Sequence, residues 1–329
     1  MKTILFVGEH ADFSGLRLGA ALGTTLALRG DNILLAGVGK MPTYLQLPVE
    51  TLPEKISTDA LSRALSKQGI ERVICIAYLP GCKAAVCAGI PCVYIEPEGL
   101  KDGESAKIKK ALLAKATQVI VIGAGDKPLD ERIYSPNAVR MENPAIWVEH
   151  QAQYKPHCFK KENNIVASGP FGKDGGFDVL LKSWAKLSVL HPTWHLTLAG
   201  YGRGKSTLQK FINQHQMQHS TELVDADQDF YALLRSADIY VNSTRTGTGK
   251  EEVMDAMASK LPVITTDAAA THVNHGVNGL IVPAGKQEPL TLALDELMVN
   301  WGKRVELAVE ASKQKEKFSF EAFTEKIRV

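Results

Sequence analysis

The chain has 329 residues, of which 45% are hydrophobic and 22% are charged. This length suits two domains of about 150 residues each, and the apolar fraction excludes a generally disordered chain. Its 38 basic and 36 acidic residues leave a formal net charge of +2. That balance argues against a protein whose main task is to coat duplex nucleic acid.

The sequence contains no run of about 18 apolar residues, the length that a membrane-spanning helix requires. The apolar start MKTILFVGEH lacks a small-residue cleavage site, so it predicts a first strand and not a signal peptide. The five cysteines form no CxxC pair and favour buried thiols of a cytoplasmic protein over disulfides or metal ligands. They are Cys75, Cys82, Cys87, Cys92 and Cys158.

The first half of the chain alternates short apolar runs with helical patterns. The predicted strands cover residues 4–8, 32–37, 72–78, 91–96 and 118–123. Between the first two, the leucine and alanine spacing of residues 15–29 predicts a helix that Gly30 ends. Such strand-helix-strand alternation produces right-handed crossovers and a parallel sheet.

The alternation stops between about residues 143 and 165, where two prolines and several polar residues occur, and then starts again. We therefore predict an α/β protein with two Rossmann-like domains, residues 1–145 and 146–310. An amphipathic terminal helix within 311–329 is expected to pack back toward the first domain. Two such parallel-sheet domains would face one another across a cleft, the default ligand site.

Five segments of the second half carry a family resemblance. In chain order they are SGPFGKDGGFDVLLKSW, HLTLAGYGRGKSTLQ, FYALLRSADIYVNST, EEVMDAMASKLPVITTD and GVNGLIVPAG. Together they resemble the retaining GT-B glycosyltransferases of the group 1 family over about residues 165–285. The resemblance implies a GT-B fold with an N-terminal acceptor-binding domain and a C-terminal donor-binding domain. It also implies transfer of a sugar from a nucleotide diphosphate to a hydroxyl, with retained configuration and without a metal.

Such chemistry requires positive potential around the departing diphosphate. The resemblance places an Arg and a Lys in the segment 169–176, but Pro170 and Gly175 occupy those positions. Lys173 lies nearby, and we expect it to rebuild a positive pocket together with Arg245 and Lys250. One such contact made only in the transition state is worth about 3 kcal/mol.

The segment 242–256 is the second expected part of the site. In the family it carries two carboxylates, Glu-x7-Glu; Asp255 matches the second, which binds ribose hydroxyls, while Gly247 replaces the first. The remaining turn runs directly into a helix, where backbone amides favour anions. Its donor-binding candidates are Thr246, Gly247, Thr248 and Gly249.

Further candidates lie outside these two segments. Gly15, in the loop 8–19, is expected to let the backbone approach the diphosphate, and Gly169 and Gly202 to shape the donor site. Glu96 or Glu98 stands where family members often have a histidine, so it would orient the acceptor or stabilise positive charge on the sugar; this position is equally compatible with a solvated loop acid. The Asp225-x-Asp227 pattern predicts a helix cap near the base and not a metal site.

The expected partners follow from this chemistry. No cofactor is implied beyond the donor substrate, for which a UDP-sugar is the family's commonest choice, and no metal is expected. The acceptor is a hydroxyl-bearing glycan, lipid-linked compound or small molecule. The lysine-rich helix predicted at 106–116 is a solvated face or a contact with an anionic membrane or with the acceptor. A membrane contact would place a cytoplasmic protein at the inner face of the membrane. The alternatives are a catalytically silent sugar-nucleotide-binding or partner protein and a sugar-nucleotide epimerase.

Overall fold

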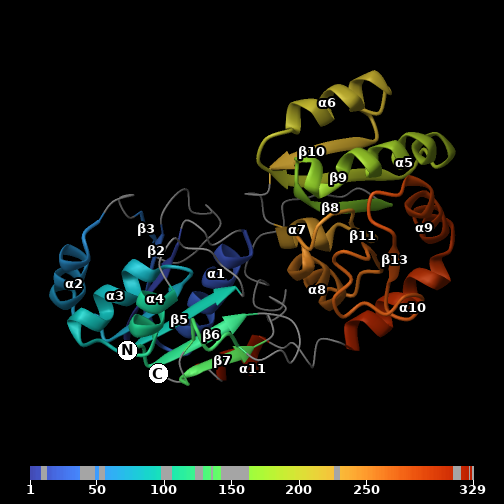
Figure 1. Ribbon diagram of the computed structural model, residues 1–329. Coiled ribbons are helices and arrows are strands. Elements are labelled where there is room, and N and C mark those ends of the chain that lie inside the picture. The colour runs from blue at the N-terminus through green and yellow to red at the C-terminus, as the bar shows by residue number, and fades with distance from the viewer. Residues whose placement is uncertain are drawn as a thin grey trace. The chain divides into compact units, whose positions relative to one another are not determined.

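The computed structural model of residues 1–329 shows an α/β protein (Figure 1). It describes residues 1–8, 13–37, 49–51, 56–97, 106–122, 129–134, 136–141, 163–225, 230–313, 320–325 and 327. The chain divides into two compact units. The first comprises Met1–Ile146 and Phe318–Val329, and the second comprises Trp147–Lys317.

The first unit is built on a seven-stranded sheet in the order β3-β2-β1-β4-β5-β6-β7. All paired strands in it run parallel. Its strands are β1 (Lys2–Val7), β2 (Asn32–Gly37), β3 (Val49–Thr51), β4 (Arg72–Ile76), β5 (Cys92–Pro97), β6 (Gln118–Ile122) and β7 (Ala138–Met141). Its helices are α1 (Phe13–Leu28), α2 (Thr58–Lys67), α3 (Leu79–Ala88), α4 (Ala106–Leu113) and α11 (Phe320–Glu325).

Continuous apolar runs form the central strands of this sheet. Every residue of β4 and β6 is buried, as expected when helices cover both faces of a parallel sheet. Cys75, Cys82 and Cys92 lie in this core as free thiols, but Cys87 is exposed on α3, so its predicted burial is wrong. The buried face of α3 includes Ala84 and Ala85, and Cys87 falls outside it.

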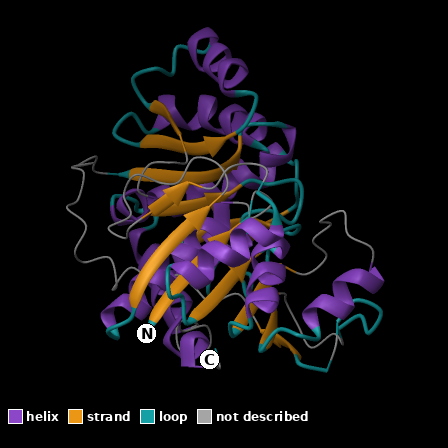
Figure 2. Cartoon of the chain, turned by 90° about the vertical axis from the view of Figure 1, so that its left-hand side faces the viewer, coloured by secondary structure: helices purple, strands orange, loops and turns teal. Residues whose placement is uncertain are grey.

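The second unit is built on a six-stranded parallel sheet in the order β10-β9-β8-β11-β12-β13. Its strands are β8 (Asn164–Pro170), β9 (His195–Tyr201), β10 (Thr221–Asp225), β11 (Ile239–Asn242), β12 (Val263–Thr266) and β13 (Leu280–Val282). Its helices are η2 (Lys173–Gly175), α5 (Phe177–Leu190), α6 (Lys205–Gln214), α7 (Phe230–Arg235), α8 (Lys250–Ala258), α9 (Gln287–Val299) and α10 (Trp301–Ser312). Figure 2 shows the layering of helices against strands.

Helices α5 and α9 anchor the core of the second unit. Trp184 on α5 is completely buried, and Leu294 on α9 belongs to the same apolar cluster. Ser183 donates to the carbonyl of Gln287, and further along both helices His191 contacts Asp295. The two helices therefore run in the same direction. This packing holds the middle and the end of α5, a helix that begins beside the candidate site.

The two sheets share one connection pattern. In each, the first strand lies centrally, the next two follow on one side and the fourth lies on the other. The order therefore reverses between β1 and β4 in the first unit and between β8 and β11 in the second. In open α/β sheets, ligands bind beyond the carboxyl ends of the strands at such a reversal.

The last two helices of the chain belong to different units. Helix α10 lies in the second unit, whereas α11 lies in the first, where Arg29 donates a hydrogen bond of 3.1 Å to Thr324. Among the described residues, no helix has the length and apolar character needed to cross a bilayer.

Candidate functional site

Two loops follow the strands at the order reversal of the second unit. Residues 171–176 follow β8 and lead into α5, and residues 243–249 follow β11 and lead into α8. Because β8 and β11 are paired in parallel, both loops leave the same edge of the sheet. They contain half of the site residues predicted from the sequence.

Direct contacts join the two loops. Gly176 has a φ of +69°, and a Cβ at this position would collide with the carbonyl oxygen of Ser243. The Ser243 hydroxyl donates to the carbonyl of Gly175 at 2.8 Å, and the Thr244 hydroxyl donates to that of Asp174 at 3.0 Å. A residue with a side chain would not fit at Gly176, so the close approach of the loops depends on glycine there.

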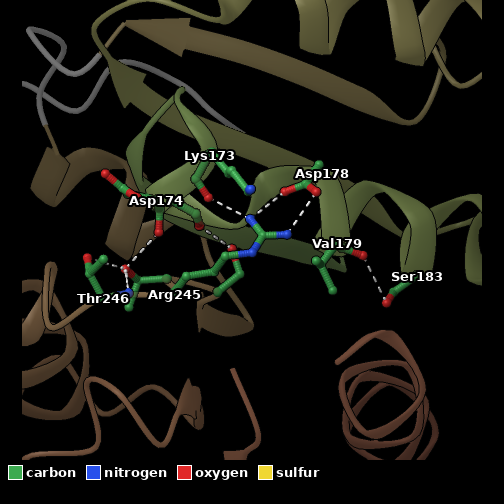
Figure 3. Close-up of polar contacts among 10 residues, drawn as sticks. Lys173, Asp174, Asp178, Val179, Ser183, Arg245 and Thr246 are labelled. Atoms are coloured by element: carbon green, nitrogen blue, oxygen red, sulfur yellow. Dashed lines mark hydrogen bonds and ion pairs between the residues drawn. The ribbon is translucent and has the colours of Figure 1, made fainter. Parts of the chain in front are cut away.

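Arg245 fastens the same two loops through its side chain (Figure 3). Its guanidinium makes a two-pronged ion pair with Asp178 at 2.7 and 2.8 Å, and it also donates to the carbonyl of Lys173 at 2.5 Å. Its backbone N–H donates to the carbonyl of Asp174 at 2.7 Å. The structure therefore gives Arg245 a paired charge, whereas the sequence suggested a cation free to meet a phosphate.

Asp178 was missed by the sequence analysis. It lies in the first turn of α5, 67 positions before Arg245, and no local pattern connects the two. The hydrogen bonds from Arg245 lower the pKa of the Asp178 carboxyl, and the same contacts raise the pKa of the guanidinium. Both groups are therefore charged at neutral pH.

Asn242 holds the second loop from within. Its amide nitrogen donates to the carbonyls of Thr248 and Gly249 at 3.1 and 2.9 Å, and its oxygen accepts from the N–H of Thr244 at 3.0 Å. The hydroxyls of Thr244, Thr246 and Thr248 lie within 2.8 to 3.3 Å of one another. The predicted residues Thr246 and Thr248 thus share a hydroxyl cluster at the sheet edge.

Helix α8 begins at this edge without a side-chain cap. Its N-cap is Gly249, which offers no hydroxyl or carboxylate to the first amides of the helix. Those N–H groups and the helix dipole favour an anion. Lys250 adds a charge: its Nζ lies 3.4 Å from where a Cβ of Gly247 would stand. Two carboxylates in the same turn, Glu251 and the buried Glu252, partly offset this potential.

Lys173 is the second lysine at this edge. It begins the short helix η2, and its side chain is exposed. Within the described part of the chain, neither Lys173 nor Lys250 takes part in an ion pair that would compensate its charge. In the two loops and the first turn of α8, the positive groups that face solvent are therefore these two lysines and the helix start.

Asp255 and two glycines complete the predicted donor site. Asp255 is only 2% exposed and accepts a hydrogen bond of 3.4 Å from the Tyr231 hydroxyl, so its carboxylate faces the interior side of α8. Gly169 lies within β8 and Gly202 follows β9, with φ values of +153° and +81°. Both lie at the carboxyl edge, while the predicted ribose contact of Asp255 remains a prediction.

Two predicted residues lie in the first unit. Gly15 lies in the first turn of α1, where the sequence predicted a helix to begin, and not in the loop 8–19 that was also assigned to it; its contact with a diphosphate remains a prediction. Glu96, the penultimate residue of β5, is completely buried, which makes the solvated-acid interpretation wrong for it, and Glu98 lies outside the described residues. Its carboxylate pairs with Lys109 of α4 at 2.7 Å and accepts from the Tyr134 hydroxyl. Both oxygens of the carboxylate are engaged by these contacts, whereas the predicted catalytic role requires the carboxylate to contact a sugar.

The aspartate pattern after β10 lies only partly within the described residues. Asp225 pairs with Lys205 at 2.7 Å, and Asp227, with the predicted cap, lies outside the described residues.

Comparison with known proteins shows which family the second unit resembles. Residues 162–300 match the family model described as Glycosyl transferases group 1. A curated relative, the exopolysaccharide phosphotransferase SCO2592 of Streptomyces coelicolor, is 26% identical over 149 residues, which are 44% of this chain and 16% of that protein. The match spans less than a third of the length of each of the first two curated relatives.

Solved structures extend the likeness to both units. A glycosyltransferase from Rickettsia africae superposes with a TM-score of 0.73 at 15% identity, covering 99% of this chain and 96% of that one. The chain has the GT-B fold. A second GT-B match, Anabaena Alr3699/HepE in complex with UDP and glucose, has a TM-score of 0.66 at 15% identity and covers 98% and 96% of the two chains. The predicted GT-B fold is confirmed, and the predicted resemblance to group 1 glycosyltransferases is confirmed for residues 162–300.

Proposed function

We propose that this GT-B protein is a glycosyltransferase that moves a sugar from a nucleotide diphosphate to an acceptor hydroxyl in glycan biosynthesis. The observation that carries the proposal is the edge formed by residues 171–176 and 243–250. There, an uncapped helix start and two lysines present positive potential at the order reversal of a domain that matches the group 1 family.

Each proposed role follows from this geometry. The amides at the start of α8 and the lysines Lys250 and Lys173 would receive the diphosphate as the sugar leaves. Because Arg245 is paired with Asp178, we assign it to holding the two loops together. Thr246 and Thr248 offer hydroxyls to the donor, and Asp255 would need to expose its carboxylate to reach a ribose.

We further propose that the donor is a UDP-sugar, that the anomeric configuration is retained and that no metal takes part. The Anabaena neighbour in complex with UDP and glucose supports the first point. Lysines and a helix start can stabilise a leaving diphosphate without a cation. The acceptor is proposed as a hydroxyl-bearing glycan, lipid-linked compound or small molecule, with peripheral contact at a membrane surface.

A silent sugar-nucleotide-binding protein is the second candidate. Two glycines favour it: Gly247 replaces the family's first carboxylate, and Gly175 replaces one of its diphosphate-binding cations. The pairing of Arg245 with Asp178 favours it as well. Turnover, and not binding, distinguishes the two candidates, because an enzyme and a silent protein would both bind the nucleotide.

The test measures binding and turnover on the full chain. Calorimetric titration with UDP, GDP and ADP, followed by slow hydrolysis of the matching sugar nucleotides, should give one preferred base and a measurable rate. Lys250→Ala is expected to lower the hydrolysis rate about 100-fold, because it removes one cation from the transition state. Lys260→Ala, at an exposed lysine beyond the same helix, is the matched control.

Two results would change the assignment. Nucleotide binding with no hydrolysis and no transfer to any acceptor would establish the silent protein. Absence of binding to all three nucleoside diphosphates would remove both candidates.

A further inference from the structure

Tyr201 is an exposed aromatic residue at the edge that carries the candidate site. It is the last residue of β9 and pairs in register with Pro170, the last residue of β8. The five residues directly before it in β9 are buried, but Tyr201 is 44% exposed. Among the described residues, it and Trp301 are the aromatic members of the exposed large apolar set, and Trp301 begins α10 instead of following a strand.

The backbone beneath Tyr201 is held against the first loop of the site. A Cβ at Gly200 would lie 2.5 Å from the ring of Phe171 and 2.7 Å from the carbonyl oxygen of Gly169, so only glycine allows this approach. The N–H of Phe171 donates to the carbonyl of Tyr201 at 2.9 Å. Tyr201 is therefore fixed relative to residues 171–176, where we place the diphosphate.

The two neighbours of the diphosphate site differ in chemistry. A nucleoside attached to a diphosphate at β8 and β11 must extend over β9 or over β12, each one strand away at about 4.8 Å. Beyond β12 the chain continues with Asp267 and three alanines, which offer no ring. Beyond β9 it offers Tyr201, and the Lys205–Asp225 pair at 2.7 Å provides polar groups on the same side.

We propose that Tyr201 is the surface on which the nucleobase of the donor stacks, and that it sets the direction in which the nucleotide lies across the sheet. This inference rests on the proposed function, since it requires a nucleotide at the edge. Stacking on an aromatic ring tolerates any base, so Tyr201 contributes affinity for the nucleoside, while neighbouring polar groups distinguish one base from another.

The experiment compares a probe that has a base with one that lacks it. Affinities for UDP and for inorganic pyrophosphate are measured by calorimetry on the full chain, for the unmodified protein and for Tyr201→Ala, Tyr201→Phe and Trp301→Ala. Tyr201→Ala should weaken UDP about 10-fold and leave pyrophosphate unchanged. Tyr201→Phe should retain UDP affinity because it keeps the ring, and Trp301→Ala should change neither affinity. Thermal unfolding of each variant checks the fold.

The outcomes separate this inference from the proposed function. If the unmodified protein binds UDP and Tyr201→Ala binds it equally well, the stacking role is wrong and the proposed function stands. If Tyr201→Ala weakens UDP and pyrophosphate to the same extent, the residue shapes the edge and does not meet the base. If the unmodified protein binds no nucleoside diphosphate, both proposals are overturned.

Discussion

Each unit contains a carboxylate paired with a cation near the carboxyl end of its sheet, and the two pairs differ in burial. In the first unit the side chains of Glu96 and Lys109 are 0% and 5% exposed. In the second, those of Asp178 and Arg245 are 46% and 24% exposed. Water screens the second pair and not the first. The inner pair is therefore a fixed part of the core, whereas the outer pair can be broken at small cost.

The largest expected effect comes from breaking the inner pair. Lys109→Met should destabilise the first unit by about 3–5 kcal/mol, because it leaves the Glu96 carboxylate buried without its cation. Scanning calorimetry of the full chain measures the loss, and Lys107→Met, at an exposed position of the same helix, is the control. Adding Glu96→Leu to Lys109→Met should recover part of the stability. A loss below 1 kcal/mol in the single variant would show that the pair is not isolated from water.

An intermediate effect is expected where the two loops of the second unit meet. Gly176→Ala combines a left-handed backbone with a collision against the carbonyl of Ser243, which should cost roughly 2–4 kcal/mol. Gly202→Ala has a similar φ, but nothing lies within 4 Å of the added Cβ, so about 1 kcal/mol is expected. Chemical denaturation compares the two. Equal losses would mean that the loops separate without cost.

The smallest effect is expected from the outer pair. Asp178→Asn should lower the free energy of unfolding by about 1 kcal/mol or less at pH 7, since both partners are partly exposed. The folded-state pKa of Asp178 is lowered, so the pair contributes fully above the unfolded pKa of about 3.9 and loses its contribution as the pH falls through the folded pKa. Denaturation at pH 7 and pH 3 should therefore show that the free energies of unfolding of the unmodified protein and Asp178→Asn differ less at the lower pH. A stability difference that does not change with pH would show that it does not come from the charge of Asp178.

The sequence predicted the fold well because parallel strands covered on both faces are continuous apolar runs. Strands β4, β5 and β6 were all predicted for this reason. The edge strand β3, of three residues, and β7, whose exposure alternates, gave no comparable run and were not predicted. Helix α10 was also missed.

The site was predicted less completely, because its charges are set by partners far apart in the chain. The sequence identified the loops around residues 171–176 and 243–250, but it treated Arg245 as a free cation, since Asp178 lies 67 positions away. Helix α4 shows the same limit: its lysine-rich pattern predicted a solvated face, whereas Lys109 is buried against Glu96 and the apolar Ile108 is exposed. Periodicity records apolar faces and carries no information on which charge finds a distant partner.

The way Asn242 holds its loop has a practical consequence for altering substrate choice. Within the part of the chain that the structure describes, the amide of Asn242 binds backbone atoms only, at Thr244, Thr248 and Gly249. The backbone path is thus set independently of the side chains at the tip, so a library that randomises positions 246 and 248 while keeping residue 242 would vary the surface offered to a sugar on an unchanged frame.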